Sequence, residues 1–160
     1  TINPRKLKAV NICTAPFPGF PTDLQAPFTA LMTIANGESK ITETIFENRM
    51  NHINLLKKMG ANIKLDKNVA YIKGVKTIKG MDLVASDLRS SAALIIAGII
   101  AKGSSKIYGL EHLDRGYENF ESKLKILGIK ITRESNKRSF SKKEYSISQE
   151  SEEIQKCKAA

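Results

Sequence analysis

The chain has 160 residues and a net charge of +10, with 41% hydrophobic and 26% charged residues. This composition is typical of a folded domain, and with only two cysteines it excludes collagen-like, wholly disordered and disulfide-framework proteins. The longest apolar run, residues 92–101, is about half of the roughly 20 residues that cross a bilayer, so we expect a soluble, cytoplasmic protein. Because the lysines are scattered and only 6% of residues are aromatic, we expect neither a nucleic-acid nor a membrane partner.

The first half of the chain predicts strands and helices in a definite order. A strand-like segment at residues 9–13 comes first, and Thr22-Asp23 then precedes an apolar helix that ends before Gly37. The predicted elements are a helix at residues 24–35, a strand at 40–44, a helix at 49–59 and strands at 62–65 and 69–73. The first helix is apolar almost all round, so it should be buried, whereas the second should lie on a surface.

The second half repeats this order at an offset of 64 to 68 residues. Thr22-Asp23 corresponds to Ser86-Asp87, Gly37 to Gly103, and Arg49 to Arg115. The predicted elements are a strand at residues 81–84, a helix at 89–101, a strand at 106–108, a helix at 117–127 and a strand at 130–132. We therefore predict an α/β (α+β) protein with helices inside, built from two copies of one unit, at about residues 14–79 and 80–133.

Residues 134–160 differ in composition from the rest of the chain. They include six serines, six basic and five acidic residues, without apolar periodicity. Such a segment buries too little apolar surface to offset the loss of chain entropy on folding. We expect a disordered or loosely helical tail.

Two aspartates and three arginines are the strongest candidates for a functional site. Asp23 and Asp87 begin the two apolar helices, where a carboxylate can cap the helix or serve in a site for an anion or a catalytic step. Arg89 follows Asp87 closely, and Arg49 and Arg115 precede the two amphipathic helices. The planar fork of arginine suits bidentate binding of phosphate or carboxylate, although a single arginine is often only a surface ion-pair partner.

Other polar residues give weaker signals. His52 should be a surface or boundary residue of its amphipathic helix, and Cys13 a small buried hydrophobe. The histidines and cysteines lack metal-ligand spacing, and neither a GxGxxG nor a Walker motif occurs. Reasoning from residue patterns alone thus predicts an anion-binding α/β repeat protein.

Four longer motifs resemble one enzyme family. They are PGFPTDLQA at residues 18–26, ITETIFENRMNH at 41–52, DLRSSAAL at 87–94 and HLDRGYE at 112–118. In this order, from about residue 3 to residue 133, the chain resembles the UDP-N-acetylglucosamine enolpyruvyl transferases, also named UDP-N-acetylglucosamine 1-carboxyvinyltransferases. The related family that makes enolpyruvylshikimate phosphate shares the fold but lacks the PGFPTD and ITETIFENR segments, so we discount it.

The resemblance implies a fold and an activity. The fold would be an inside-out α/β barrel of repeated βαβαββ units, of which two are present here. The activity would be transfer of an enolpyruvyl group from phosphoenolpyruvate to the 3-hydroxyl of UDP-N-acetylglucosamine, the first committed step of peptidoglycan biosynthesis. Neither a cofactor nor a metal is implied.

The resemblance also implies roles for individual residues. Asp23 resembles the general base that binds the 3-hydroxyl of the sugar, and Asp87 resembles a second catalytic carboxylate that handles protons. Ile45, with Phe46 beside it, resembles the segment that contacts the UDP-sugar. Arg89 and Arg115 resemble the pair that binds phosphoenolpyruvate.

The match is to a portion of the family's sequence. The essential lysine of the family and its loop with a cysteine general acid have no counterpart here, and Cys13 does not occupy that loop. The chain therefore resembles the C-terminal portion, and its partner would be the N-terminal half of the enzyme. The alternative is a non-catalytic remnant or binding module that retains only affinity for anions.

Overall fold

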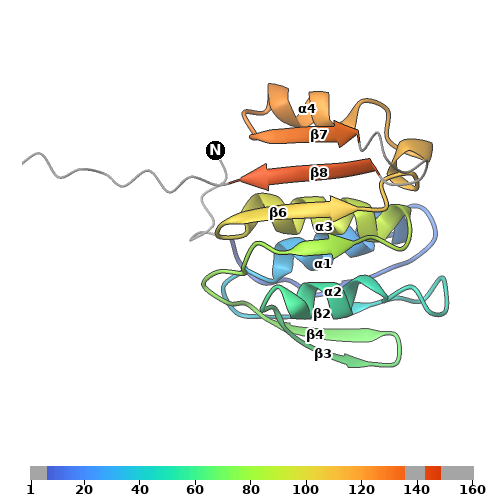
Figure 1. Ribbon diagram of the computed structural model, residues 1–160. Helices are drawn as coiled ribbons and strands as arrows, with labels where there is room; N and C mark the ends of the chain where they lie inside the picture. Colours follow the sequence, from blue (N-terminus) through green and yellow to red (C-terminus); the bar gives the residue numbers. More distant parts are fainter. Residues whose placement is uncertain (1–6, 136–142, 149–160) are drawn as a thin grey trace, which may run out of the picture.

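A computed structural model describes residues 7–135 and 143–148, which form two copies of the same β-α-β-α-β-β unit (Figure 1). The first unit consists of β1 (Ile12–Cys13), α1 (Gln25–Met32), β2 (Glu38–Thr42), α2 (His52–Lys58), β3 (Asn62–Asp66) and β4 (Val69–Lys73). The second consists of β5 (Asp82–Val84), α3 (Leu88–Ile100), β6 (Ser104–Tyr108), α4 (Phe120–Ile126), β7 (Ile131–Ser135) and β8 (Lys143–Ser148). Two short 3-10 helices, η2 (Thr22–Leu24) and η3 (Leu113–Arg115), complete the described elements.

Each unit forms its own four-stranded open sheet, and the two sheets have the same topology. The strand orders are β1-β2-β4-β3 and β5-β6-β8-β7. In each sheet the first two strands are parallel, because a helix connects them, and the other pairs are antiparallel. Ile41 pairs with Ile12 and Ala70 in the first sheet, and Ile107 pairs with Leu83 in the second.

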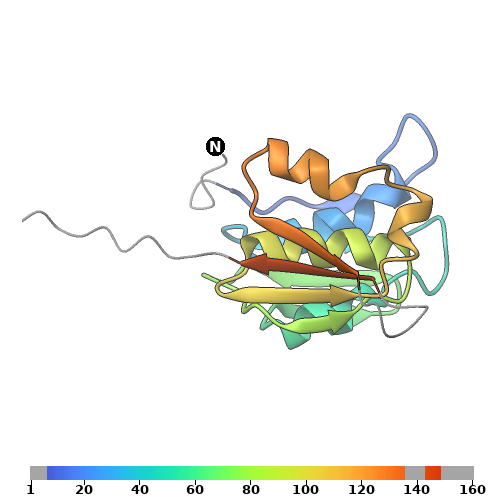
Figure 2. The same cartoon turned by 45° about the horizontal axis from the view of Figure 1, so that its top comes forward.

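The core lies around the first helix of each unit. Helices α1 and α3 pack against each other, and Figure 2 shows both beside the sheets. Both contain fully buried alanines, Ala26 and Ala30 in α1 and Ala93 and Ala97 in α3. Small side chains let two helix axes approach closely. The prediction that these apolar helices lie inside is confirmed, and the fold is the mixed α/β arrangement expected from the repeat.

A glycine stands between the buried helix and the second strand at matching places in the two units. Gly37 has φ +113° and Gly103 has φ +97°, both in the left-handed region that side chains other than glycine rarely adopt. Each is followed at once by the second strand of its unit, β2 or β6. These glycines therefore let the chain reverse from the buried helix into the sheet.

The strand β8 corrects the prediction for residues 134–160. Residues 134–135 end β7, and β8 lies between β6 and β7 as an interior strand of the second sheet. The second unit thus extends to residue 148 and not to residue 133. Composition did not reveal this strand, because an interior strand is held by main-chain hydrogen bonds to both neighbours. The rest of the predicted tail lies outside the described residues.

The longest helix of the described chain, α3, has 13 residues. Within residues 7–135 and 143–148, no helix is both long and apolar enough to cross a membrane.

Candidate functional site

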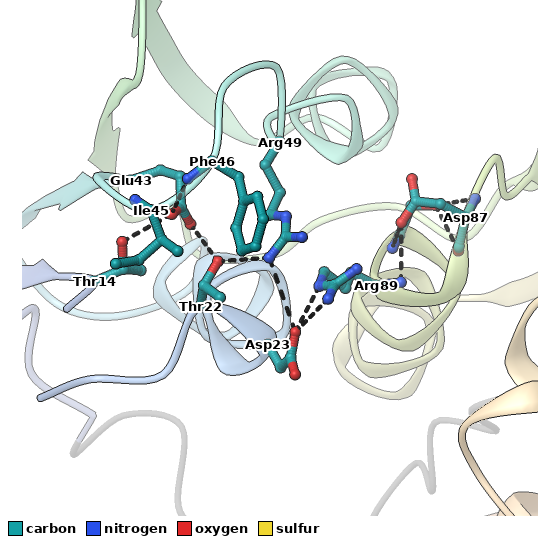
Figure 3. Close-up of polar contacts among 10 residues, drawn as sticks. Thr14, Thr22, Asp23, Glu43, Ile45, Phe46, Arg49, Asp87 and Arg89 are labelled. Carbon is teal, nitrogen blue, oxygen red and sulfur yellow. Dashed lines mark hydrogen bonds and ion pairs between the residues drawn. The ribbon is translucent and has the colours of Figure 1, made fainter. Parts of the chain in front are cut away.

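The site lies where the N-terminal ends of the two buried helices meet (Figure 3). Asp23 lies in η2, immediately before α1, and Arg89 lies in the first turn of α3. Arg89 Nε donates a hydrogen bond of 2.8 Å to Asp23 Oδ1, and Arg89 Nη2 donates to the same oxygen. The Asp23 side chain is 70% exposed. An ion pair between the two repeats therefore faces solvent at the start of both helices.

Asp87 caps helix α3. Its Oδ1 accepts hydrogen bonds of 2.9 Å from the backbone N–H groups of Arg89 and Ser90, and its own N–H donates to Ser90 Oγ at 3.0 Å. Burial alone would raise the pKa of Asp87, but hydrogen bonds from Ser86 and from Ser90 and Arg89 outweigh it, so the pKa is lowered. Asp87 is an ionised capping residue, whereas the side chain of Asp23 makes no cap hydrogen bond.

Arg49 adds a second cation beside Asp23. Its Nη1 donates to Thr22 Oγ1 at 2.9 Å and lies 3.9 Å from Asp23 Oδ1, and its guanidinium carbon lies 3.6 Å from the centre of the Phe46 ring. Burial lowers the pKa of Arg49, and the nearby charge of Arg89 lowers it further. Two guanidinium groups thus share one aspartate, and their N–H donors suit an anionic ligand.

A buried glutamate connects the segments that carry these residues. Glu43 is 1% exposed, and its Oε2 accepts a hydrogen bond of 2.7 Å from the Thr22 hydroxyl. Its Oε1 accepts from the Thr14 hydroxyl and Ile45 N–H at 2.9 Å, and from Phe46 N–H at 3.2 Å. Burial would raise the pKa of Glu43, but these hydrogen bonds outweigh it and lower the pKa.

The segment after β2 borders two hollows in the surface. A groove of about 760 Å³ is lined by residues that include Ile45, Phe46 and Asn54. A smaller hollow of about 260 Å³ is lined by residues that include Phe46, Asp87 and Arg89. Phe46 lines both hollows and is 48% exposed. An extended ligand could therefore contact this segment and the ion-pair cluster at once.

His52 and Cys13 differ from the expectation. His52 lies at the start of α2 but is only 2% exposed, because this end of α2 packs against α3. Burial lowers the pKa of His52 to about 4 against the partly compensating charge of Asp87, so the imidazole is neutral at pH 7. Cys13, predicted to be buried in its strand, is exposed, because successive side chains of a strand point to opposite faces and its neighbours Ile12 and Thr14 take the inner one.

The structure places the predicted site residues in two groups. Asp23 and Arg89 are in direct contact, and Asp87, Ile45 and Phe46 belong to the same cluster and hollows. Arg115 ends η3, is exposed and lines neither hollow. The structure thus joins five of the six predicted residues around one surface region.

Sequence reasoning missed Glu43, Thr14 and Thr22. The available signal was strand periodicity, since alternate residues of β2, Ser39 and Ile41, are buried and Glu43 continues that face. A carboxylate on an inward face needs hydrogen-bond donors, and threonines are suitable ones. Among the described residues, no group of three histidines, cysteines or acidic residues could hold a metal ion.

Relatives with assigned names match the whole chain or most of it. The chain is 76% identical over 160 residues to the UDP-N-acetylglucosamine 1-carboxyvinyltransferase of Prochlorococcus marinus (strain MIT 9312). This match covers 100% of the chain and 35% of that protein. It is 54% identical over 130 residues to the protein of the same name from Synechocystis sp. (strain ATCC 27184 / PCC 6803 / Kazusa), covering 81% of this chain and 30% of that one. The chain thus spans about a third of the length of these relatives.

Solved structures and a family model agree with these matches. The enolpyruvyl transferase NikO from Streptomyces tendae has a TM-score of 0.67 and 31% identity, over 76% of this chain and 28% of that one. EPSP synthase from Acinetobacter baumannii, at 15% identity, shares the fold with a TM-score of 0.65, over 88% of this chain and 30% of that one. The model of the EPSP synthase (3-phosphoshikimate 1-carboxyvinyltransferase) family matches residues 1–124. Because that match covers more than half of the sequence, the chain belongs to the family that this model defines, the EPSP synthase family, and its relatives at 76% and 54% identity are named UDP-N-acetylglucosamine 1-carboxyvinyltransferases.

Proposed function

We propose that this chain forms part of the active site of an enzyme that transfers enolpyruvyl from phosphoenolpyruvate to the 3-hydroxyl of UDP-N-acetylglucosamine. The observation that carries the proposal is the cluster of Asp23, Arg49 and Arg89 at the joined N-terminal ends of α1 and α3. Both substrates are polyanions, and helix N-termini with arginines favour anions. The names of the relatives and the four motifs support the choice of substrates.

The transfer needs a base and an acid on opposite sides of the substrates. The sugar hydroxyl loses its proton and its oxygen attacks C2 of phosphoenolpyruvate, while the methylene carbon gains a proton. Loss of phosphate and of one proton from the new methyl group then restores the double bond. Asp23 is the base in this proposal, because its carboxylate is exposed and can reach a bound hydroxyl.

Arg89 has two alternative partners in the proposed reaction. Its Nε and Nη2 both contact Asp23. A phosphate or carboxylate of phosphoenolpyruvate offers the same fork an equivalent, charge-assisted pairing. Arg89 would then release Asp23, and binding of the anion would free the base. Arg115 would reach the same anion when the cleft is complete.

Asp87 acts in this proposal by supporting Arg89 and by handling a proton. Its ionised carboxylate holds the first turn of α3, from which Arg89 projects. Because its lowered pKa keeps Asp87 ionised, this carboxylate has no proton to supply and could only accept one from the intermediate.

The loop after β2 is the proposed contact for the UDP-sugar. The N–H groups of Ile45 and Phe46 are already bonded to Glu43. A ligand in the groove would therefore meet the carbonyl groups and side chains of this loop. The half-exposed Phe46 ring offers an apolar surface for the sugar or the uracil.

The whole enzyme, in this proposal, acts in the cytoplasm at the first committed step of peptidoglycan biosynthesis. The chain spans about a third of its relatives, so we propose that it represents the C-terminal portion and that the remaining sequence supplies the acid. By itself the chain would have no transfer activity, because water weakens the charges on an open wall.

A chimeric enzyme tests this proposal. Residues 1–160 replace the matching segment of the relative from strain MIT 9312, and phosphate release is measured with both substrates. We expect turnover by the chimera and none by the 160-residue chain alone. A folded but inactive chimera would support the alternative of a non-catalytic remnant. Turnover by the chain alone would contradict the need for an opposite wall.

A further inference from the structure

Three segments that are distant in sequence meet at one buried carboxylate. Thr14 follows β1, Thr22 begins η2, and Ile45–Phe46 follow β2, yet all donate hydrogen bonds to Glu43 (Figure 3). Main-chain bonds add to this junction, because Glu43 N–H donates to the carbonyl of Asn68 at 2.9 Å. The segments that carry the proposed base and the proposed sugar loop are therefore tied to one side chain.

The junction requires an acceptor at both carboxyl oxygens. Two of the four donors are backbone N–H groups, which cannot turn around to accept. A proton on Oε1 would leave Ile45 N–H and Phe46 N–H facing another donor inside the protein. Only the carboxylate form satisfies all four donors at once, and it does so while 1% exposed.

The junction also determines the direction of the next hydrogen bond. The Thr22 hydroxyl has one proton, and it points to Glu43 Oε2 at 2.7 Å. The lone pairs of this hydroxyl are thus free to accept from Arg49 Nη1 at 2.9 Å. Arg49 in turn reaches Asp23 at 3.9 Å.

We propose that Glu43 is a positioning residue, whose carboxylate holds the Ile45–Phe46 loop and, through Thr22 and Arg49, orients the cation beside Asp23. Glu43 is 1% exposed and four donors hold its carboxylate, so its effect on the reaction is indirect. The kinetic part of this inference rests on the proposed function, whereas the orientation of Arg49 does not.

The substitution Glu43→Gln separates positioning from simple packing. Glutamine keeps the shape and one acceptor oxygen, which can still serve Thr14 and the two N–H groups. Its amide nitrogen, however, would donate to the Thr22 hydroxyl, whose proton would then have to turn away from residue 43. The orientation that the carboxylate gives this hydroxyl, with a lone pair toward Arg49, would be lost. Glu38→Gln is the matched control, because Glu38 lies on β2 in an exposed ion pair with Lys73 at 3.5 Å.

Two measurements test the proposal. In the chimera, Glu43→Gln should lower kcat/KM at least about tenfold, since misplacement by about 1 Å can cost on the order of 100-fold. In the 160-residue chain, the Arg49 side chain should become more mobile, as measured by nitrogen-15 NMR relaxation of its Nε–H signal. The backbone amide spectrum should otherwise be retained. Glu38→Gln should change neither quantity.

A lower melting temperature for Glu43→Gln, with kinetic constants and Arg49 mobility equal to those of Glu38→Gln, would overturn the proposal. If Glu43→Gln does not fold, Thr22→Val removes the hydroxyl that connects Glu43 to Arg49. It should likewise lower kcat/KM and make the Arg49 side chain more mobile. Unchanged Arg49 mobility in Thr22→Val would also overturn it. An inactive parent chimera would contradict the proposed function, while the NMR measurement would still decide the role of Glu43.

Discussion

The buried histidine should make the stability of this chain depend on pH in a window where few other groups titrate. His52 is 2% exposed, and burial lowers its pKa from 6.5 to about 4. Between these values the unfolded chain binds one more proton than the folded chain. The free energy of unfolding therefore rises with pH across this window. The contribution of His52 is fully present above pH 6.5 and is lost as the pH falls from 6.5 to about 4.

The size of this effect follows from the shift. Each pKa unit corresponds to about 1.4 kcal/mol, so a shift of this size corresponds to roughly 3 kcal/mol. For a domain whose whole free energy of unfolding is about 5–15 kcal/mol, that is a large fraction. Glu43 and Asp87 also have lowered pKa values, but their contributions are lost only as the pH falls below their ordinary values of 4.5 and 3.8.

Urea unfolding followed by circular dichroism measures the effect, at pH steps from 7 to 4.5. His52→Gln should flatten the slope of the free energy of unfolding against pH, because it removes the imidazole and keeps a polar side chain. His112→Gln, which removes the other histidine, is the matched control and should retain the His52 contribution. The reasoning would be refuted by equal slopes for the parent chain and His52→Gln, or by an NMR titration that places the His52 midpoint near 6.5.

Four further predictions concern the site and the second sheet. In the chimera, Asp23→Asn should lower kcat by roughly 100-fold or more, yet leave the melting temperature nearly unchanged, because Asp23 is exposed and makes no cap hydrogen bond. Arg115→Lys should raise KM for phosphoenolpyruvate more than for the UDP-sugar, and equal changes in steady-state assays would count against this role. Asp87→Ala should lower the free energy of unfolding by about 1 kcal/mol in urea titrations, with Asp87→Asn close to the parent. Ser146→Pro should cost at least about 1–3 kcal/mol by removing a main-chain hydrogen bond from the interior strand β8, and stability equal to that of Ser146→Ala would contradict the sheet order.

Most of the fold could be predicted from the sequence, because its signals are local. Apolar runs, the Ser86-Asp87 start and the glycines at positions 37 and 103 depend on a few neighbouring residues. They gave the order of helices and strands and the presence of two repeats, with α3 starting one residue from the predicted start. The Thr22-Asp23 pair was correctly placed just before α1. The prediction that it caps this helix was wrong, because both residues lie in the 3-10 turn η2 and make no cap hydrogen bond.

The roles of the polar residues were decided by tertiary structure. Whether an aspartate caps a helix or pairs with Arg89 of the other repeat depends on which helix ends meet, and the two residues are 66 positions apart. In the sequence, Glu43 is one polar residue of a longer motif. Only the folded chain brings the Thr14 and Thr22 hydroxyls to its carboxylate as donors. His52 likewise reads as a surface residue until α3 covers it.

The strand β8 illustrates the same division. Its composition predicted a tail, because hydrophobicity counts side chains and the segment is polar. Its place in the sheet comes from main-chain hydrogen bonds to β6 and β7, which every residue except proline can make once two partner strands lie at the right distance. The sequence by itself thus determined the repeat and its buried helices through local patterns. Tertiary structure alone decided which polar groups face each other and which strand completes the second sheet, because both depend on contacts between distant segments.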